Sequence, residues 1–453
     1  MRRPERRFSI ALLALSLVLT GPLVRPAAAE EAILRLGLRD VLVQAGRRGT
    51  EVLVSEERVR QAASRTWQAY TAFMPQVSAE LSETRQYRNL RAQGIEIPGQ
   101  EDALVGPFSS FEGRLRVTQI VFDMAAIQRL LAVRDGERVS RAQLVKARQD
   151  ALAWAASLYL EAVRAEDVAR LSDAGVEVAG VRSRLAHRRL RSGNASVAEV
   201  KEARALYLEA CRRSAEATDA ARTAKEDLLA ALGYDPHTPL ELDRERDRED
   251  LPSFSARRES PSSLGAHPDL RVAAEAVRQR RAEERVQWYE YLPKVNVHAE
   301  YGPSGEQPSD ADEIYLFGGR VTMPVFEGGQ RAFRIGEAAS RAREQQLRTD
   351  ETRRQLEADI LEARRLTERS LLGLKAASAR MAAAEERQRH ALRRRQNGSG
   401  SEWELVEAGW ARAQAREERS RAETLCLSSA IRYGRASGQL EAWTREISGG
   451  TYV

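Results

Sequence analysis

Four short stretches of the chain alternate between apolar and polar residues, as half-exposed β-strands do. MPQVSAELS begins at Met74, FEGRLRVT at Phe111, PKVNVHAEY at Pro293 and IYLFGGRVT at Ile314. Such alternation places apolar side chains on one face of a strand and polar side chains on the other. The fourth stretch is the least regular, because Ile314 and Leu316 blur the pattern. The pattern predicts a sheet with one apolar face and one charged face.

Two interpretations fit this sheet. One is the half-buried antiparallel sheet of a soluble protein, and the other is the wall of a transmembrane β-barrel, with apolar residues toward lipid and polar residues toward a water-filled lumen. Four strands cannot close a useful pore, so the barrel interpretation requires strands from other chains. Under that interpretation, the predicted lumen-facing residues are Arg114, Arg116, Thr118, Arg320 and Thr322.

Between the strands, the spacing of apolar residues changes to steps of three and four, which is typical of helices that pack along their length. Proline is absent between Pro107 and Pro236, and Ala, Glu, Arg, Leu and Gln dominate. About 68 residues run from Ala125 to a glycine turn at Gly193, which predicts a helix of roughly 100 Å. An ordinary two-helix coiled coil would show the same spacing. Only the predicted strands distinguish this chain from a coiled coil.

The chain contains this unit twice. RLRVTQIVFDMAAIQRLL, from Arg114, is matched by GRVTMPVFEGGQRAFRI, from Gly319. Each copy predicts a helix, a proline, two strands, a long helix, a glycine turn and a second helix. Asp123 and Glu327 mark the changes from strand to helix, and both are expected in the first helical turn, where a carboxylate is favoured.

The duplication predicts how the chain is divided. Arg88 to Pro107 and Gly302 to Asp312 are polar or rich in turn residues, and we expect both to be solvent loops between strands. The expected segments are a signal peptide (1–29), a first repeat (30–240), a linker (241–266), a second repeat (267–440) and a short tail (441–453).

The N-terminus has the pattern of a secretory signal peptide, with a basic start, a short apolar stretch and Ala27-Ala28-Ala29 before the expected cut. A retained membrane anchor is the alternative, but the apolar stretch is short for a membrane span. No run of 18 apolar residues follows the predicted signal peptide, so the sequence predicts no transmembrane helix after it.

Charge and composition exclude several function classes. Residues 1–29 contain five arginines and one glutamate, so their removal lowers the formal net charge from +6 to +2. The remaining charges are intermixed and no aromatic residues cluster with them, which disfavours a nucleic-acid partner. Cys211 and Cys426 form no C-x-x-C motif, the five histidines are scattered, and G-x-S-x-G and P-loop motifs are missing. We therefore expect no enzymatic activity, metal or cofactor.

These motifs resemble those of the TolC-like outer-membrane efflux protein family. The resemblance rests on FMPQVSAE with its copy YLPKVNVHAE, on VTQIVFD and MPVFEGGQR, and on the turns SGNASVAEVKEA and NGSGSEWELVEA. It extends from about Leu36 to Leu440. It implies a mainly α-helical protomer that contributes four strands to a trimeric 12-stranded β-barrel in the outer membrane of a Gram-negative bacterium, and long antiparallel helices to a periplasmic tunnel.

The function that the resemblance implies is passive export of small molecules or proteins, in a tripartite efflux or type I secretion system. The implied partners are two further copies of the chain, outer-membrane lipid, a periplasmic adaptor protein and an inner-membrane pump of the RND, ABC or MFS type. A periplasmic coiled-coil adaptor or scaffold without channel activity is the alternative. An adaptor would be expected to show one helical hairpin flanked by compact β-domains, whereas two hairpins are predicted here.

The resemblance also implies a constriction at the periplasmic end, with Glu404 and Glu407 as its acidic residues and Glu199 and Glu202 at the matching positions of the first copy. A spacing of three places each pair on one helix face. For any one of these glutamates, the alternative is an ordinary solvated helix residue. The turn residues expected at the tips, where an adaptor would dock, are Gly193, Asn194, Gly398 and Ser399.

Overall fold

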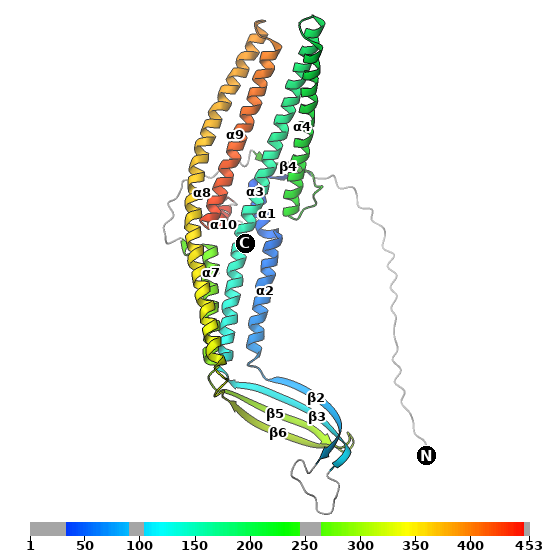
Figure 1. The fold of residues 1–453 in the computed structure, drawn as a ribbon, viewed down its shortest axis with the longest axis vertical. Coiled ribbons are helices and arrows are strands. Elements are labelled where there is room, and N and C mark those ends of the chain that lie inside the picture. The colour runs from blue at the N-terminus through cyan, green and yellow to red at the C-terminus, as the bar shows by residue number, and fades with distance from the viewer. Residues whose placement is uncertain (1–32, 90–103, 245–263, 448–453) are drawn as a thin grey trace, which may run out of the picture.

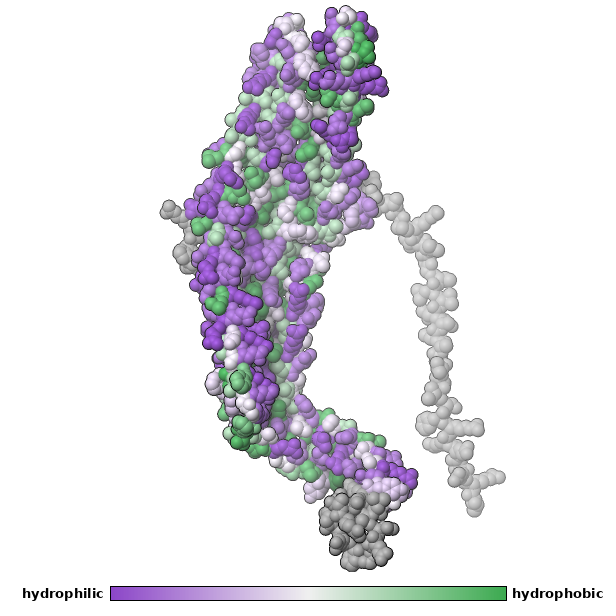
Figure 2. Space-filling view, viewed as in Figure 1, coloured by the Kyte–Doolittle hydropathy of each residue, from purple (hydrophilic) through white to green (hydrophobic). Residues whose placement is uncertain are grey.

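The structure is a computed structural model that describes residues 33–89, 104–244 and 264–447. The predicted signal peptide and most of the predicted linker lie outside these residues. Figure 1 shows an elongated molecule with a β-sheet at one end and the tips of two helical hairpins at the other. Within the described ranges, no helix is both long enough and apolar enough to cross a membrane. Figure 2 shows hydrophilic residues over much of the surface of the helical part.

The helices confirm the internal duplication. The first copy contributes helices of 22, 68 and 35 residues, and the second contributes helices of 22, 67 and 35 residues. In chain order they are α2 (Thr50–Thr71), α3 (Met124–Arg191), α4 (Val197–Ala231), α7 (Pro268–Tyr289), α8 (Gln330–Gln396) and α9 (Glu402–Ala436).

The two long helices run through the whole helical part, and their neighbours change at mid-length. Near the sheet, α3 packs against α2 and α7, and α7 packs against α8; toward the tips, α3 packs against α4 and α9, and α9 against α8. The 68 residues of α3 correspond closely to the predicted helix. Its start is fixed by Asp123, whose carboxylate accepts a hydrogen bond from the Ala126 N–H at 3.0 Å.

The matching expectation for Glu327 is wrong. Helix α8 begins at Gln330, with Gly329 as its N-cap, so Glu327 precedes the helix. Gly328 and Gly329 both have positive φ, 60° and 81°, and this left-handed turn delays the start of the helix. Glu327 still contacts the first turn, because the Arg331 guanidinium lies 2.8 Å from its carboxylate.

The four long strands form one antiparallel sheet in the order β2-β3-β5-β6. Their bounds are β2 (Gln76–Asn89), β3 (Leu104–Phe122), β5 (Lys294–Gly305) and β6 (Asp312–Thr322). The strands extend further than expected. The first expected loop began at residue 88 and ended at 107, but residues 88–89 belong to β2 and residues 104–107 to β3. The second expected loop began at residue 302, but residues 302–305 belong to β5. Residues 90–103 of the first expected loop lie outside the described part of the chain.

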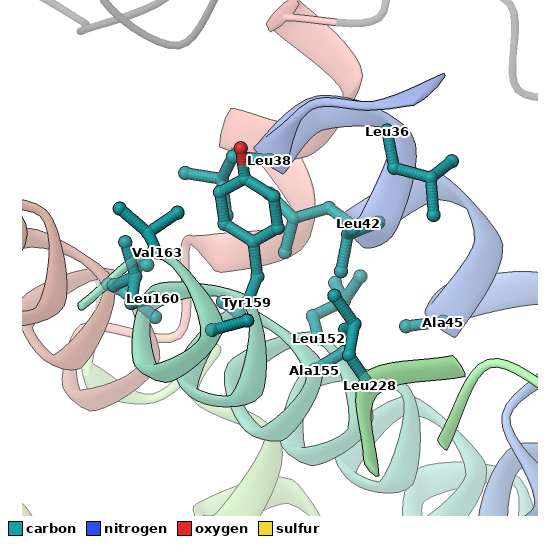
Figure 3. Packing of buried hydrophobic residues seen from close by; sticks show 14 of the residues in the cluster. Leu36, Leu38, Leu42, Ala45, Leu152, Ala155, Tyr159, Leu160, Val163 and Leu228 are labelled. Atoms are coloured by element: carbon teal, nitrogen blue, oxygen red, sulfur yellow. The ribbon is translucent and has the colours of Figure 1, made fainter. Parts of the chain in front are cut away.

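The largest hydrophobic core lies at mid-length, where the neighbours of α3 change. Small elements gather there: β1 (Leu34–Leu36), α1 (Leu38–Arg48), β4 (Leu240–Leu242) and α10 (Leu440–Ile447). Figure 3 shows Leu38 and Leu42 of the N-terminal segment beside Leu152 and Tyr159 of α3, with Leu228 of α4 beneath. Alanines on α3 allow α1 to approach closely, which lets this core form on the side of a single long helix.

Two expected boundaries cut through this core. The linker was expected to begin at 241, but β4 lies there and pairs in parallel with β1. The tail was expected to begin at 441, but it starts inside α10, whose Leu440 and Thr444 are almost completely buried. β4 and α10 pack here because their leucines complete the core. The charged composition of the linker and the short length of the tail did not indicate this packing.

Candidate functional site

Both hairpin tips end in the same hydrogen-bonded turn. After α3, the N–H groups of Gly193 and Asn194 donate to the carbonyls of Leu190 and Arg189, at 3.0 and 2.8 Å. Gly398 and Ser399 donate in the same way after α8. These are Schellman motifs, which require a left-handed residue, and φ is 76° at Gly193 and 74° at Gly398. The predicted turn residues thus lie at the exposed tips.

The second helix of each hairpin begins at a serine cap. The Ser196 hydroxyl accepts a hydrogen bond from the Glu199 N–H at 3.2 Å, and the Ser401 hydroxyl accepts one from the Glu404 N–H at 3.1 Å. The Glu404 carboxylate in turn accepts from the Ser401 N–H, which completes a capping box. The S-x-x-E spacing in both turns carries this signal in the sequence, although neither cap was predicted.

The predicted acidic residues at the tips do not all line one cavity. Glu199 and Glu202 line a cavity of about 550 Å³ between α3, α4 and the start of α9. The same cavity is also lined by Arg182 and Arg189 of α3 and by Trp403 of α9. Glu404 instead faces its own hairpin, where the Arg394 guanidinium lies 3.5 Å from its carboxylate. Glu407, three residues after Glu404 on α9, is exposed, and neither of these two residues lines the cavity of Glu199 and Glu202.

One ion pair joins the two hairpins near their tips. The Arg188 guanidinium of α3 donates to the Glu402 carboxylate of α9 at 2.9 Å. The hydrogen bond from Arg188 lowers the pKa of Glu402 below its ordinary value. Neither residue was predicted, because nothing in the linear pattern places the end of α3 beside the start of α9.

At the opposite end of the molecule, strand register places the five predicted lumen residues on one face of the sheet. Arg116 of β3 is paired with Glu300 of β5, and Thr118 with His298. On the other side of β5, Arg320 and Thr322 of β6 are paired with Asn296 and Lys294. Alternate residues of one strand share a face, so Arg114 joins the same set: Arg114, Arg116, Thr118, Arg320 and Thr322.

Glu300 binds two arginines of the polar face. Its carboxylate accepts a hydrogen bond from Arg116 Nε at 2.7 Å and one from Arg114 Nη1 at 3.2 Å. Arg114 also lies 2.9 Å from Glu112 on its own strand. This cross-strand network was not predicted, because strand register is not visible in a single sequence.

The other face of the sheet is apolar and exposed. Leu81 of β2, Phe317 of β6 and Tyr315 of β6 are 75, 78 and 86% exposed in the single chain. Leaving such side chains in water instead of burying them forgoes about 1.5–3 kcal/mol each. An apolar surface of this extent marks a contact with protein or membrane.

Comparison with known proteins agrees with this arrangement. Residues 41–234 and 260–439 match the family model described as outer membrane efflux protein. The chain belongs to this family. Protein CyaE of Bordetella pertussis is 28% identical over 241 residues, and the chain spans about half (48%) of the length of this curated relative.

Two solved outer-membrane channels have a similar fold. The CmeC channel of Campylobacter jejuni is 17% identical, with a TM-score of 0.74 over 91% of this chain and 89% of CmeC. The MtrE channel of Neisseria gonorrhoeae, solved in its open state, is 18% identical, with a TM-score of 0.68 over 89% of each chain. The predicted fold class is confirmed for the protomer, which is mainly α-helical, duplicated, and built of four strands and long antiparallel helices; one chain by itself does not show the predicted trimeric 12-stranded barrel. The family is one of transport proteins located in the outer membrane, as the sequence predicted.

The serine cap gives a local test of the tip. Replacing Ser401 by alanine removes the acceptor for the Glu404 N–H and should destabilise the first turn of α9 by about 1 kcal/mol. Amide hydrogen exchange of residues 402–405 is then expected to accelerate about fivefold. Ser428→Ala is the control, because that hydroxyl bonds only the Leu425 carbonyl within α9. Unchanged exchange at 402–405 in the Ser401 variant would show that the cap does not stabilise the tip.

Proposed function

We propose that this chain forms a passive outer-membrane duct through which an export system moves its cargo. The observation that carries the proposal is the sheet, whose apolar face is exposed while its polar face holds a network of charged residues. This sheet ends a helical part whose long helices span roughly 100 Å at 1.5 Å per residue. In a family of outer membrane efflux proteins, this division supports a strand part in the membrane and a helical part in the periplasm.

The edges of the sheet support a trimer. Strands β2 and β6 are the outer strands of the four, so each leaves one row of backbone groups unpaired in the single chain. Inside a membrane these groups need partners, because lipid offers no hydrogen bonds. Three chains would supply twelve strands, and pairing β6 of one copy with β2 of the next would close the ring. The polar face would then line the lumen.

The helical part supplies the rest of the passage. Near the sheet the packing order is α2-α3-α7-α8, and toward the tips it is α4-α3-α9-α8, so each chain contributes four adjacent helices at either level. Three such walls make a tunnel of twelve helices. The proposed partners are a periplasmic adaptor, docked on the exposed turns at Gly193–Asn194 and Gly398–Ser399, and an inner-membrane pump that supplies energy. Small molecules and proteins are both candidate cargoes.

The acidic residues near the tips are proposed to form the constriction. In a trimer, Glu199, Glu202, Glu404 and Glu407 would each recur three times around the axis. Rings of carboxylates favour cations, and their mutual repulsion opposes tight closure. Arg394 offsets part of this charge through its contact with Glu404.

The alternative, a periplasmic adaptor or scaffold, fits the structure less well. A soluble scaffold would be expected to bury large apolar residues, whereas this sheet exposes residues such as Phe317 and Tyr315. Two long hairpins joined side by side also differ from the single hairpin expected of an adaptor.

Ion selectivity tests the proposed function. After reconstitution in a planar bilayer under a KCl gradient, the wild-type channel should prefer cations, and Glu404→Gln with Glu407→Gln should reduce the cation-to-anion permeability ratio about twofold or raise the basal conductance. The control variant is Glu337→Gln with Glu344→Gln, which removes the same charge from α8 near the sheet. If the tip variant and the wild type have equal selectivity and conductance, these glutamates do not form the constriction.

A further inference from the structure

A buried histidine lies where α7, α9 and α3 meet. His267 is the N-cap residue of α7 and is only 1% exposed. Its ring packs against the glycine turn after α9, so closely that a Cβ on Gly438 would lie 2.9 Å from His267 Cδ2. Helix α3 reaches the same turn, because Gln149 Nε2 donates to the Gly438 carbonyl at 2.8 Å. The ring thus lies at a junction between the first repeat and both ends of the second.

The hydrogen bonds of the ring require its neutral form. The Asp269 N–H donates to His267 Nδ1 at 3.2 Å, so Nδ1 carries no proton. His267 Nε2 lies 3.2 Å from the carbonyl oxygen of Arg435, which can only accept, so Nε2 carries the proton and donates it. Each nitrogen of the neutral ring therefore has a partner, one at the start of α7 and the other at the end of α9.

Two cations and two carboxylates surround this junction: Arg435 of α9, Lys146 and Asp150 of α3, and Asp269 of α7. The Arg435 guanidinium lies 2.6 Å from the Asp150 carboxylate and 3.0 Å from that of Asp269. The Lys146 ammonium contacts both carboxylates as well. The Asp269 carboxylate is 3.6 Å from His267 Nδ1, which is too far for a hydrogen bond. Both carboxylates already have cationic partners, so neither is free to pair with a charged imidazole.

The other segments at the junction add little charge. Residues 264–266, just before His267, and residues 437–439, the turn beside the ring, contain no ionisable side chain. In α10, the ionisable residue nearest to this turn in the sequence is Glu441. The charges that act on the ring therefore come mainly from Asp269, Arg435 and Lys146.

Protonation of the ring would disrupt these contacts. A proton on Nδ1 would point at the Asp269 N–H, so the bond that caps α7 would be lost. The new N–H could turn only toward the Asp269 carboxylate, where it would compete with Arg435 and Lys146. Burial lowers the pKa of His267, and the two cations act in the same direction; the Arg435 carbonyl and the Asp269 carboxylate oppose this without reversing it.

We propose that His267 is an acid-sensitive joint between the two repeats, which holds the start of α7 on the end of α9 while its ring is neutral and loosens this contact when the ring is protonated. The joint is a property of the single chain, so it does not depend on the proposed duct.

The pH range of the joint follows from the lowered pKa. An ordinary histidine side chain has a pKa of 6.5. Because the pKa of His267 is lower in the folded chain, the opened chain binds a proton first. The junction is therefore most stable above pH 6.5 and loses stability as pH falls from 6.5 to the lowered folded-state pKa. Asp269 responds only below its own ordinary pKa of 3.8, so the two groups act in separate ranges.

Amide hydrogen exchange of the purified mature protein tests the joint at pH 7.5 and at pH 5.5, one unit on either side of 6.5. After correction for the intrinsic effect of pH on exchange, protection of residues 269–271 and 437–440 should fall about three- to tenfold at the lower pH. Tenfold is the limit for one group that fully resists protonation over this range. In His267→Asn, the amide oxygen can still cap α7 but does not titrate, so protection should be the same at both pH values.

Two controls separate His267 from other groups that titrate. His187→Asn removes an exposed histidine of α3, whose Nδ1 contacts the Ser183 carbonyl, and it should keep the wild-type response. Glu441→Gln should also keep it. The wild type alone already tests the proposal, because protection that is equal at the two pH values would overturn it. A full response in His267→Asn, or loss of the response in Glu441→Gln, would overturn it as well.

Discussion

Replacing Arg435 by glutamine is expected to lower the free energy of unfolding by about 2 kcal/mol, because the partly buried Asp269 carboxylate loses one of its two cationic partners and Asp150 loses the nearer of its two. Arg435 lies in the last turn of α9. Its Nε donates to Asp150 of α3 at 2.6 Å, and its Nη1 donates to Asp269 of α7 at 3.0 Å. Lys146 of α3 binds Asp269 as well. The Arg435 guanidinium therefore links the end of α9 to the start of α7 and to α3, the long helix of the first repeat.

Burial by itself raises the pKa of Asp269, but the hydrogen bonds from Arg435 and Lys146 outweigh it and hold the pKa below its ordinary value. A carboxyl with a lowered pKa in the folded state stabilises the fold above its unfolded pKa, and this stability is lost as pH falls through the folded pKa. The difference between wild type and Arg435→Gln should therefore shrink at acid pH.

Thermal unfolding followed by circular dichroism measures this effect. The control is Arg432→Gln, also in α9, whose single pair with Glu362 is exposed on both sides and should contribute less than about 1 kcal/mol. A lower midpoint is expected for Arg435→Gln and an almost unchanged one for Arg432→Gln. Equal midpoints for the two variants would show that the cluster does not hold the repeats together.

Reversing the charge of Arg188 is expected to open the tips. Arg188→Glu replaces an attraction between the two hairpins by repulsion from Glu402, and in a trimer it does so in three places at once. A single exposed ion pair has a small effect on the opening equilibrium. If the three tips open together, the effects of the three changes on the opening equilibrium constant multiply. The time-averaged conductance of the reconstituted channel is expected to rise at least about tenfold.

The reciprocal change provides the control for this effect. Glu402→Arg alone should also raise the conductance, whereas Arg188→Glu with Glu402→Arg should restore the wild-type value. In the wild type, Arg188 lowers the pKa of Glu402, so the pair persists at neutral pH and is lost only as pH falls through that lowered pKa. If the double variant conducts like the single variants, then the ion pair is not a constraint on the tips.

Local chemistry in the sequence determined much of this fold. The length of α3 was predictable because Asp123 caps its start, Gly193 ends it and no proline interrupts the residues between them. The faces of the strands were predictable because apolar and polar side chains alternate in the four stretches, with Ile314 and Leu316 of the fourth as exceptions. The shared turn of the two tips followed from glycines at matching positions.

Features that depend on register or on distant contacts were not predictable. Gly302 and Pro303 have the composition of a turn, yet β5 continues through them. A Cβ on Gly302 would lie 2.0 Å from the Gly113 carbonyl oxygen, so the glycine there permits β3 and β5 to approach closely. The contact of Arg188 with Glu402 joins residues 214 positions apart.

Single-channel recording tests the central claim most directly. The purified mature protein, with its mass first measured in detergent, is added to a planar lipid bilayer under voltage. A mass of three chains and discrete, cation-preferring conductance steps are the predicted result. A monomeric protein that leaves the bilayer silent under all conditions in which it remains folded would contradict the channel.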